Sequence, residues 1–133
     1  MSTPALSSTR PSNILRRAMR GNALFSGASG LLSLIEARPL ATFTGLDAPA
    51  VFVGLGITLL AYAALLFVVT NGETVERPYG IAAVVLDLAW VAGSAAILLS
   101  GWPELTIAGR WTVALLAEAV AFFAAWQWYG LRR

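Results

Sequence analysis

The sequence predicts an all-α fold, namely a four-helix transmembrane bundle of up-down-up-down topology with both termini in the cytoplasm. Three observations predict it: four apolar segments of membrane-spanning length, a very apolar composition and an uneven distribution of arginine. Hydrophobic residues make up 58% of the 133 positions and charged residues 12%, with a mean hydropathy of +0.73. Because soluble domains carry about 25% charged residues, we expect lipid to be the solvent for most of this chain.

Four apolar segments are expected to form the spans, because each approaches the roughly 20 residues that cross about 30 Å of hydrocarbon. They cover residues 17–35, 49–69, 79–99 and 107–129. The segment 1–13 is rich in Ser, Thr and Pro and cannot bury enough surface to order itself. We therefore predict a disordered cytoplasmic tail at 1–13 and one four-helix transmembrane domain at 14–133.

The first segment has the weakest hydrophobic signal of the four. It contains Arg20 and Asn22, and its apolar run 23–35 follows basic residues as the hydrophobic region of a secretory signal does. The sequence at 36–39, Glu-Ala-Arg-Pro, is a poor cleavage site for a signal peptidase. We expect the first helix to be retained, with a cleaved signal as the alternative.

Orientation follows from the basic residues, all nine of which are Arg, because Arg in short flanks is held on the cytoplasmic side. The side that carries both termini holds seven of them and the other side two. The seven are Arg10, Arg16, Arg17, Arg20, Arg77, Arg132 and Arg133, and the two are Arg38 and Arg110. The loops at 36–48 and 100–106 are therefore expected to face outward. The exclusive use of Arg, with abundant Ala and Gly, indicates a GC-rich bacterial genome and hence the bacterial cytoplasmic (inner) membrane.

Several function classes are disfavoured by composition. The chain has no Cys and no His, so we expect no disulfide, no iron–sulfur, haem or zinc ligation, and no cofactor. The arginines bracket helices instead of forming one face, so nucleic acid is not an expected partner, whereas anionic lipid headgroups are. Since no nucleophile–base pair, metal cluster or cofactor loop is present, we do not expect an enzyme.

Small and polar residues recur on one side of the first helix. Asn22, Ser26, Gly30 and Ser33 lie at spacings of three or four residues. Because small residues let helix backbones approach closely in lipid, we assign Ser26, Gly30 and Ser33 to a helix-packing seam. The polar wall of a pathway or ligand site is the alternative. Small residues at 89, 93 and 96 predict a similar packing seam on the third helix.

Two acidic residues, Asp87 and Glu118, interrupt the apolar middle of the third and fourth segments. A short connection makes these helices expected antiparallel neighbours, so both carboxyl groups are predicted to face one interior. An acidic residue at the centre of a span costs about 2.5 to 3.5 kcal/mol. We therefore expect each carboxyl to be protonated or paired with a cation or hydrogen-bond donor.

The candidate donors are few. Arg20 enters from the same side as Asp87, while neutral donors are available from Asn22, Ser26, Ser94 and Trp90. Two interpretations stay open for each acid: a structural knot that fixes helix register, or a contact to an ion or ligand.

The stretches 21–30, 86–94 and 109–111, read as GNALFSGASG, LDLAWVAGS and GRW, resemble small bacterial integral membrane proteins with four transmembrane helices and no assigned function. That resemblance implies the same fold and brings no catalytic residues. In size and helix number the chain is also similar to DoxX-like proteins, which would imply association with quinone or redox machinery.

Three functional classes follow. The first is an accessory or assembly subunit of a bacterial membrane complex, without catalysis of its own. The second is a small proton-coupled carrier that uses Asp87 or Glu118 as its titrating site. The third is a binder of lipid or quinone along the polar side of the first helix. Besides membrane lipids, other membrane subunits or a second copy of the chain are the partners expected.

Overall fold

The computed structural model describes residues 10–72, 74–101 and 103–132, and within these ranges it is all-α. The helices are α2 (Arg10–Ile35), α3 (Ala37–Thr44), α4 (Pro49–Val69), α5 (Arg77–Ser100) and α6 (Ile107–Arg132). The all-α prediction is confirmed. Of the described helices, α4, α5 and α6 are long and apolar enough to cross a membrane, which marks the chain as a multi-pass membrane protein. The fourth expected span is not confirmed, because α2 is long enough but too polar to count as a candidate.

The helix boundaries agree closely with the predicted segments except at the first. α4 matches exactly the predicted range 49–69, and α5 begins where a proline occupies the first turn, a position at which its missing N–H costs nothing. α5 ends at Ser100 and is capped by Gly101, whose φ of 76° places it in the left-handed region. α2 begins at Arg10, inside the segment predicted to be a disordered tail, and the rest of that tail lies outside the described residues.

The outward loop predicted at 36–48 contains a helix, α3, so that part of the prediction is wrong. Its residues Ala37, Ala41 and Thr44 are buried on one side, which is the spacing of an amphipathic helix. Gly45 ends α3 with a φ of 82° and its N–H donates to two carbonyls of the last turn. The last turn of α3 is bonded to Thr106, the residue before α6, which donates to the carbonyl oxygens of residues 43 and 44 at 2.6 and 2.9 Å.

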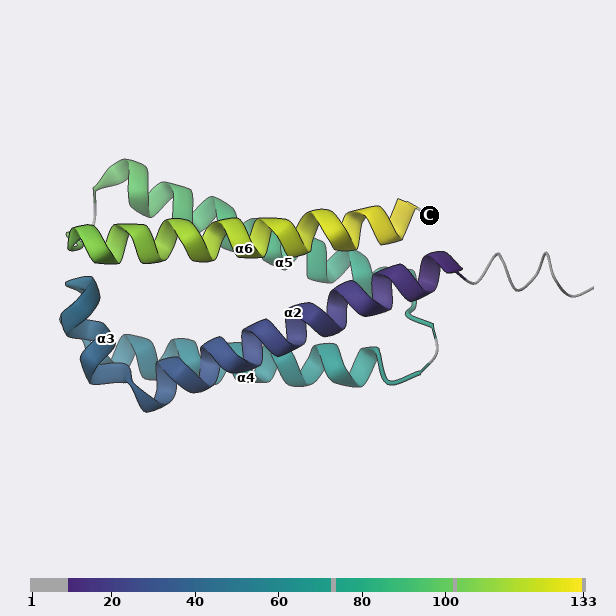
Figure 1. Cartoon of the computed structure of the whole chain (residues 1–133), viewed down its shortest axis with the longest axis horizontal. Helices are drawn as coiled ribbons and strands as arrows, with labels where there is room; N and C mark the ends of the chain where they lie inside the picture. Colours follow the sequence, from purple (N-terminus) through teal and green to yellow (C-terminus); the bar gives the residue numbers. More distant parts are fainter. Residues whose placement is uncertain (1–9, 73, 102, 133) are drawn as a thin grey trace, which may run out of the picture.

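The four long helices run lengthwise in alternating directions, and α3 lies across one end (Figure 1). α2 packs along α4, α5 packs along α6, and α2 also packs on α6. As Figure 1 shows, α2 begins and α6 ends at the end of the molecule opposite α3. We call that end the terminal end and the other the α3 end.

Apolar packing is concentrated towards the terminal end. The buried cluster there comprises Leu15, Met19, Ala23, Leu66, Val75, Ala83, Val84 and Leu131. Helices approach closely at glycines: a Cβ on Gly130 would lie 2.7 Å from the backbone of Leu15, and one on Gly56 would lie 2.7 Å from the carbonyl oxygen of Gly30. Such contacts leave room only for a hydrogen, so these glycines set the α2–α6 and α2–α4 distances.

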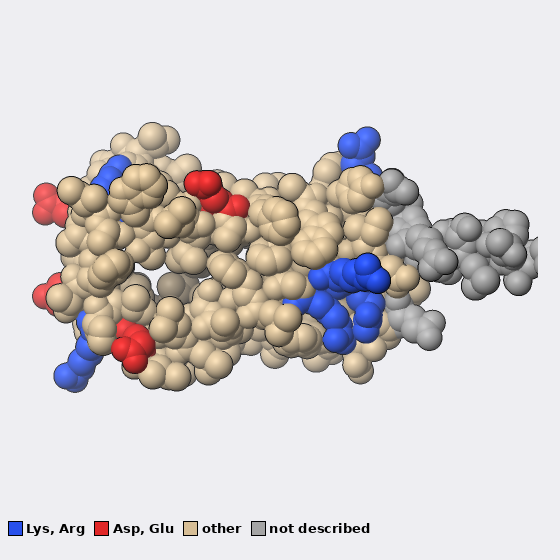
Figure 2. Space-filling model, viewed as in Figure 1, with Lys and Arg blue, Asp and Glu red and all other residues tan. Residues whose placement is uncertain are grey.

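Arginines bind the carbonyl groups at the C-terminal ends of the long helices. Arg16 donates to the carbonyls of Thr70 and Gly72 at 2.9 and 2.7 Å, beyond the end of α4. Arg77 donates to Leu131 and Arg110 donates to Leu98, each at 2.8 Å. These carbonyls have no partner within their own helix and carry the negative end of the helix dipole, which cations stabilise. Figure 2 shows basic side chains gathered at the terminal end.

Candidate functional site

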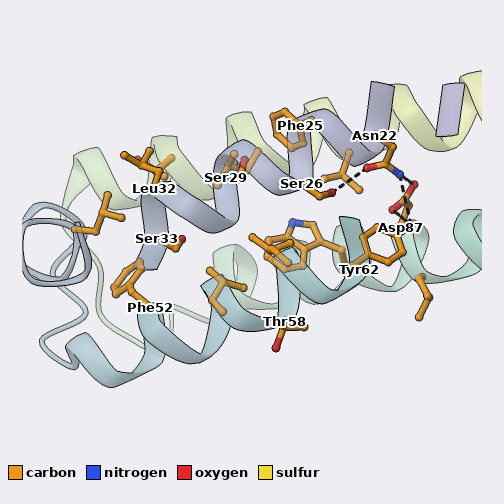
Figure 3. A pocket seen from close by; sticks show the side chains of 18 of the residues that line it. Asn22, Phe25, Ser26, Ser29, Leu32, Ser33, Phe52, Thr58, Tyr62 and Asp87 are labelled. Carbon is orange, nitrogen blue, oxygen red and sulfur yellow. Dashed lines mark hydrogen bonds between the residues drawn. The ribbon is translucent and has the colours of Figure 1, made fainter. Parts of the chain in front are cut away.

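One polar side chain from each long helix meets at a buried hydrogen-bonded cluster in the interior. The four are Asn22 of α2, Tyr62 of α4, Asp87 of α5 and Gln127 of α6, and we call them the polar cluster. Figure 3 shows Asn22 and Tyr62 converging on Asp87. α4 and α5 otherwise pack little against each other, so the Tyr62–Asp87 hydrogen bond is a direct link between these two helices.

Asp87 is the acceptor at the centre of the cluster, and its side chain is only 3% exposed. Its Oδ2 accepts from Asn22 Nδ2 at 2.8 Å and from Gln127 Nε2 at 2.9 Å, while Oδ1 accepts from the Tyr62 hydroxyl at 3.0 Å. All three donors are neutral. Three donors satisfy most of the hydrogen-bonding capacity of a carboxyl that has left water, which is the condition for burying it without a large penalty.

Asn22 holds the cluster together, because its amide reaches three of the other side chains. Besides Asp87, its Nδ2 donates to Gln127 Oε1 at 3.0 Å and lies 3.4 Å from the Tyr62 hydroxyl. Its Oδ1 accepts from the Ser26 hydroxyl at 3.1 Å, one turn further along α2. Both ends of the amide are therefore bonded, and the side chain is held in one orientation.

Arg20 was the cationic candidate to pair with Asp87, and that expectation is wrong. Its guanidinium lies 3.4 Å from the carbonyl oxygen of Thr70 and 5.7 Å from the ring centre of Phe67, both near the end of α4. The physical reason is that the carbonyls ending α4, which lack partners within the helix, attract a cation, while neutral donors already surround Asp87.

Sequence reasoning missed Tyr62 and Gln127. Tyr62 lies in the middle of a segment without charge, and Gln127 stands between two tryptophans near the end of the last apolar segment. The available signal was that each expected span contains a hydrogen-bonding side chain near the depth of Asp87. From the sequence alone, however, helix rotation was unknown, so a shared interior could not be distinguished from four separate outward-facing groups.

A cavity of about 370 Å³ extends from the polar cluster towards α3, and all five helices line it. Its walls are mostly apolar, with contributions from Phe25, Leu32, Phe52, Leu55, Leu59, Leu86, Leu116 and Val120. Residues that carry a hydroxyl group are interspersed among them, namely Ser29, Ser33, Thr44, Thr58 and Thr112. Asn22, Tyr62 and Asp87 form its inner end (Figure 3). The site thus combines apolar walls with one polar end.

Trp90 of α5 also lines the cavity, and its indole Nε1 is buried without a hydrogen-bond partner among the described residues. Buried donors are nearly always paired, so an unpaired indole N–H beside a cavity is an available donor for a bound molecule. Figure 2 shows that the molecule is hollowed between the α2–α4 pair and the α5–α6 pair, in the half that carries α3.

The residues assigned to the packing seam divide between two roles. Gly30 packs against α4, where a Cβ would lie 2.9 Å from the carbonyl oxygen of Gly56. Ser26 and Ser33 are buried and line the cavity instead. Ser94 is buried on α5 but is not part of the cavity wall. The predicted small-residue seam on α5 is wrong, because residues 89, 93 and 96 are exposed and a Cβ on Gly93 would meet nothing within 4 Å.

Glu118 does not join Asp87, so the expectation that both acids face one interior is wrong. Its side chain is exposed on α6, on the side turned away from the other helices. Asp87 and Glu118 are on packed helices, but the rotation of α6 directs Gln127 inward and Glu118 outward. Only Asp87 can therefore contact a molecule in the cavity.

Comparison with protein-family models, with curated proteins and with solved structures finds no match to the chain. The resemblance to small four-helix membrane proteins and to DoxX-like proteins therefore stays a prediction. In the described ranges no group of three or more acidic side chains is placed to hold a metal ion. The cavity and the polar cluster are therefore the features of the chain that bear on its function.

Proposed function

We propose that this chain is a four-span membrane protein, with both termini cytoplasmic, that binds a largely apolar molecule bearing one polar group in the cavity between its helix pairs. The observation that carries the proposal is the cavity itself, which joins apolar walls to a hydrogen-bonding end formed by three helices. This combination, at a volume within the roughly 300 to 1,000 Å³ typical of ligand sites, is the usual design of a small-molecule pocket.

The polar end defines what the bound molecule offers. Trp90 Nε1 is a free donor, which calls for an acceptor such as a carbonyl oxygen. Asp87 Oδ1 has one donor, Tyr62, and so retains capacity for a second. A carbonyl- or hydroxyl-bearing amphiphile of the membrane, a class that includes quinones and lipids, fits both features.

The route of entry supports a ligand taken from the membrane. The opening lies between the helix pairs, along the length of the helices and not at the terminal end, where apolar packing closes the interior. If α4, α5 and α6 cross the bilayer, this opening faces acyl chains. An apolar molecule then enters sideways without passing through water.

Two features support α2 as the fourth span. It packs along α4, which has spanning length and hydropathy, and the glycine contact between them leaves no room for lipid. Its polar side chains Asn22 and Ser26 are buried by the other helices, so they are not presented to acyl chains. The gathering of arginines at the terminal end supports the cytoplasmic placement of both termini.

The test is native mass spectrometry of the protein released from lipid nanodiscs, comparing two matched variants of α2. Ser33→Leu places a larger side chain in the cavity wall, whereas Ala28→Leu makes a comparable addition on the exposed side of the same helix. We expect wild type and Ala28→Leu to carry a bound small molecule and Ser33→Leu to lose it. A wild-type protein without any bound molecule, or equal occupancy in all three, would contradict the proposal.

A proton-coupled carrier is the second candidate, and one observation favours it: the buried carboxyl of Asp87 lines the cavity. Asp87→Asn keeps the shape of the side chain and removes its ability to titrate. In proteoliposomes with an imposed pH gradient, a carrier would show substrate uptake that this variant abolishes while ligand binding persists. The accessory-subunit role stays a prediction.

A further inference from the structure

Glu118 presents a carboxyl group from the middle of α6 to the outside of the molecule. The residue is exposed, and it has no hydrogen bond or ion pair to any residue in the ranges 10–72, 74–101 and 103–132. α6 is a candidate membrane span, and if it crosses the bilayer this carboxyl faces acyl chains and not water. Acidic groups inside membranes almost always meet a partner, and here the protein's own helices supply none.

The side chains around Glu118 form a regular exposed stripe along α6. Its members alternate at spacings of four and three residues, and each of them is exposed. They are Trp111, Leu115, Glu118, Phe122, Ala125 and Tyr129, which we call the α6 stripe. Trp111, Leu115 and Phe122 are 64, 57 and 61% exposed. A repeat of 3.5 residues is the pattern by which one helix packs along another in a left-handed crossing.

We propose that the α6 stripe is the interface of a homodimer, in which α6 of one copy packs along α6 of a second and the two Glu118 carboxyl groups hydrogen-bond to each other. A two-fold axis parallel to the helices brings each residue of the stripe near its counterpart. A protonated carboxyl is both donor and acceptor, so two copies satisfy each other without any other group. A partner of another sequence would have to supply a basic or amide side chain at the same depth.

The exposed face of α5 is the competing surface. It is rich in small residues, including Ala89, Gly93 and Ala96, and small residues permit close packing. However, it carries no polar side chain that requires a partner. Glu118 therefore directs the second copy to α6.

Cross-linking tests the geometry, and the absence of Cys from the natural chain makes single-cysteine variants direct. Leu115→Cys and Ala125→Cys lie on the α6 stripe, and Leu88→Cys, at a comparably exposed position on α5, is the matched control. In proteoliposomes under oxidising conditions we expect disulfide-linked dimers from the first two and not from the third. Equal cross-linking at all three, or cross-linking through α5 alone, would overturn the proposal.

Variants of Glu118 test the chemistry. Single-molecule photobleaching at increasing lipid dilution gives the dimer fraction of the whole chain in vesicles. Glu118→Gln retains a donor and an acceptor and should dimerise much as wild type does, whereas Glu118→Ala should weaken the dimer about tenfold or more. Because Glu118 is exposed and makes no hydrogen bond or ion pair with the described residues, circular dichroism should show both variants folded. A wild-type chain that is monomeric at every dilution would refute the homodimer. A chain that pairs only with a different polypeptide would refute it as well.

Discussion

Asn22→Ala should destabilise the protein, because it removes the amide that joins the other members of the polar cluster. It deletes the bonds from Nδ2 to Asp87 at 2.8 Å and to Gln127 at 3.0 Å, and the bond that Oδ1 accepts from Ser26 at 3.1 Å. The longer contact to Tyr62, at 3.4 Å, adds little. Gln127 Oε1 then loses its donor while remaining buried.

The magnitude follows from three lost bonds. A protein hydrogen bond contributes about 1 kcal/mol net in soluble domains, and side-chain bonds between helices in membranes average about 0.6 kcal/mol. Three such bonds give a loss of about 2 to 3 kcal/mol in the free energy of unfolding. That change corresponds to roughly a 30- to 140-fold shift in the unfolding equilibrium.

The assay is reversible unfolding in mixed micelles by titration with a denaturing detergent, followed by circular dichroism. A double-mutant cycle with Gln127→Ala isolates the shared bond and should give a coupling free energy of about 0.5 to 1 kcal/mol. Thr58→Ala is the control, since Thr58 is exposed and bonds only to a carbonyl of its own helix, at 2.9 Å. It should change stability by less than about 0.5 kcal/mol.

An Asn22→Ala variant that lowers the free energy of unfolding no more than Thr58→Ala does would contradict this prediction, because the amide would then contribute nothing that water or lipid could not replace. A different outcome would also contradict the prediction: a large loss of stability in Asn22→Ala together with a coupling free energy of zero between Asn22 and Gln127. It would mean that Asn22 matters through its volume and not through its bonds.

The remaining predictions concern packing, helix ends and topology. Gly56→Ala should destabilise the protein by about 1 to 3 kcal/mol, because its new Cβ would lie 2.7 Å from a carbonyl oxygen of α2. Gly54→Ala, on the same helix, is the control, since its new Cβ would meet nothing within 4 Å. In the same unfolding assay it should be neutral or slightly stabilising. Arg16→Gln should lower the free energy of unfolding by about 1 kcal/mol, because two carbonyls beyond the end of α4 lose their donor. Arg17 is exposed, so Arg17→Gln should lower it by less than half as much. Asp47→Cys, in the loop after α3, should react with a membrane-impermeant maleimide added to intact cells, and protection until the membrane is permeabilised would reverse the proposed orientation.

The long helices could be predicted from the sequence because the apolar composition and length of each segment are local properties. Residues 49–69 are an apolar run without charge that begins at a proline, and the structure gives the same bounds for α4. α3 was missed because eight residues with Arg and Pro produce no hydropathy signal of spanning length. Its helical pattern only matters once it packs against α4 and α6.

Only part of the candidate site could be predicted from the sequence. Asp87 and Asn22 stood out because polar groups are rare in apolar segments, and the structure places them in contact. Glu118 stood out for the same reason but lies on the outside, while Tyr62 and Gln127, which looked unremarkable in the sequence, complete the cluster. Hydropathy measures composition along a helix and is insensitive to the rotation of that helix about its axis.

The sequence by itself determined that this chain is helical and that most of it is apolar enough to lie in lipid. Except for the first helix, it also determined the ends of the long helices to within a few residues. It showed which side chains must find partners in an apolar environment. The tertiary structure decided which partners they find, because a rotation of about 100° separates successive residues on a helix and small changes in crossing exchange inside for outside. It placed Asp87 among neutral donors at the end of a cavity, and it left Glu118 facing outward. Those two positions, and not the presence of the acids, are what the proposed binding site and the proposed dimer rest on.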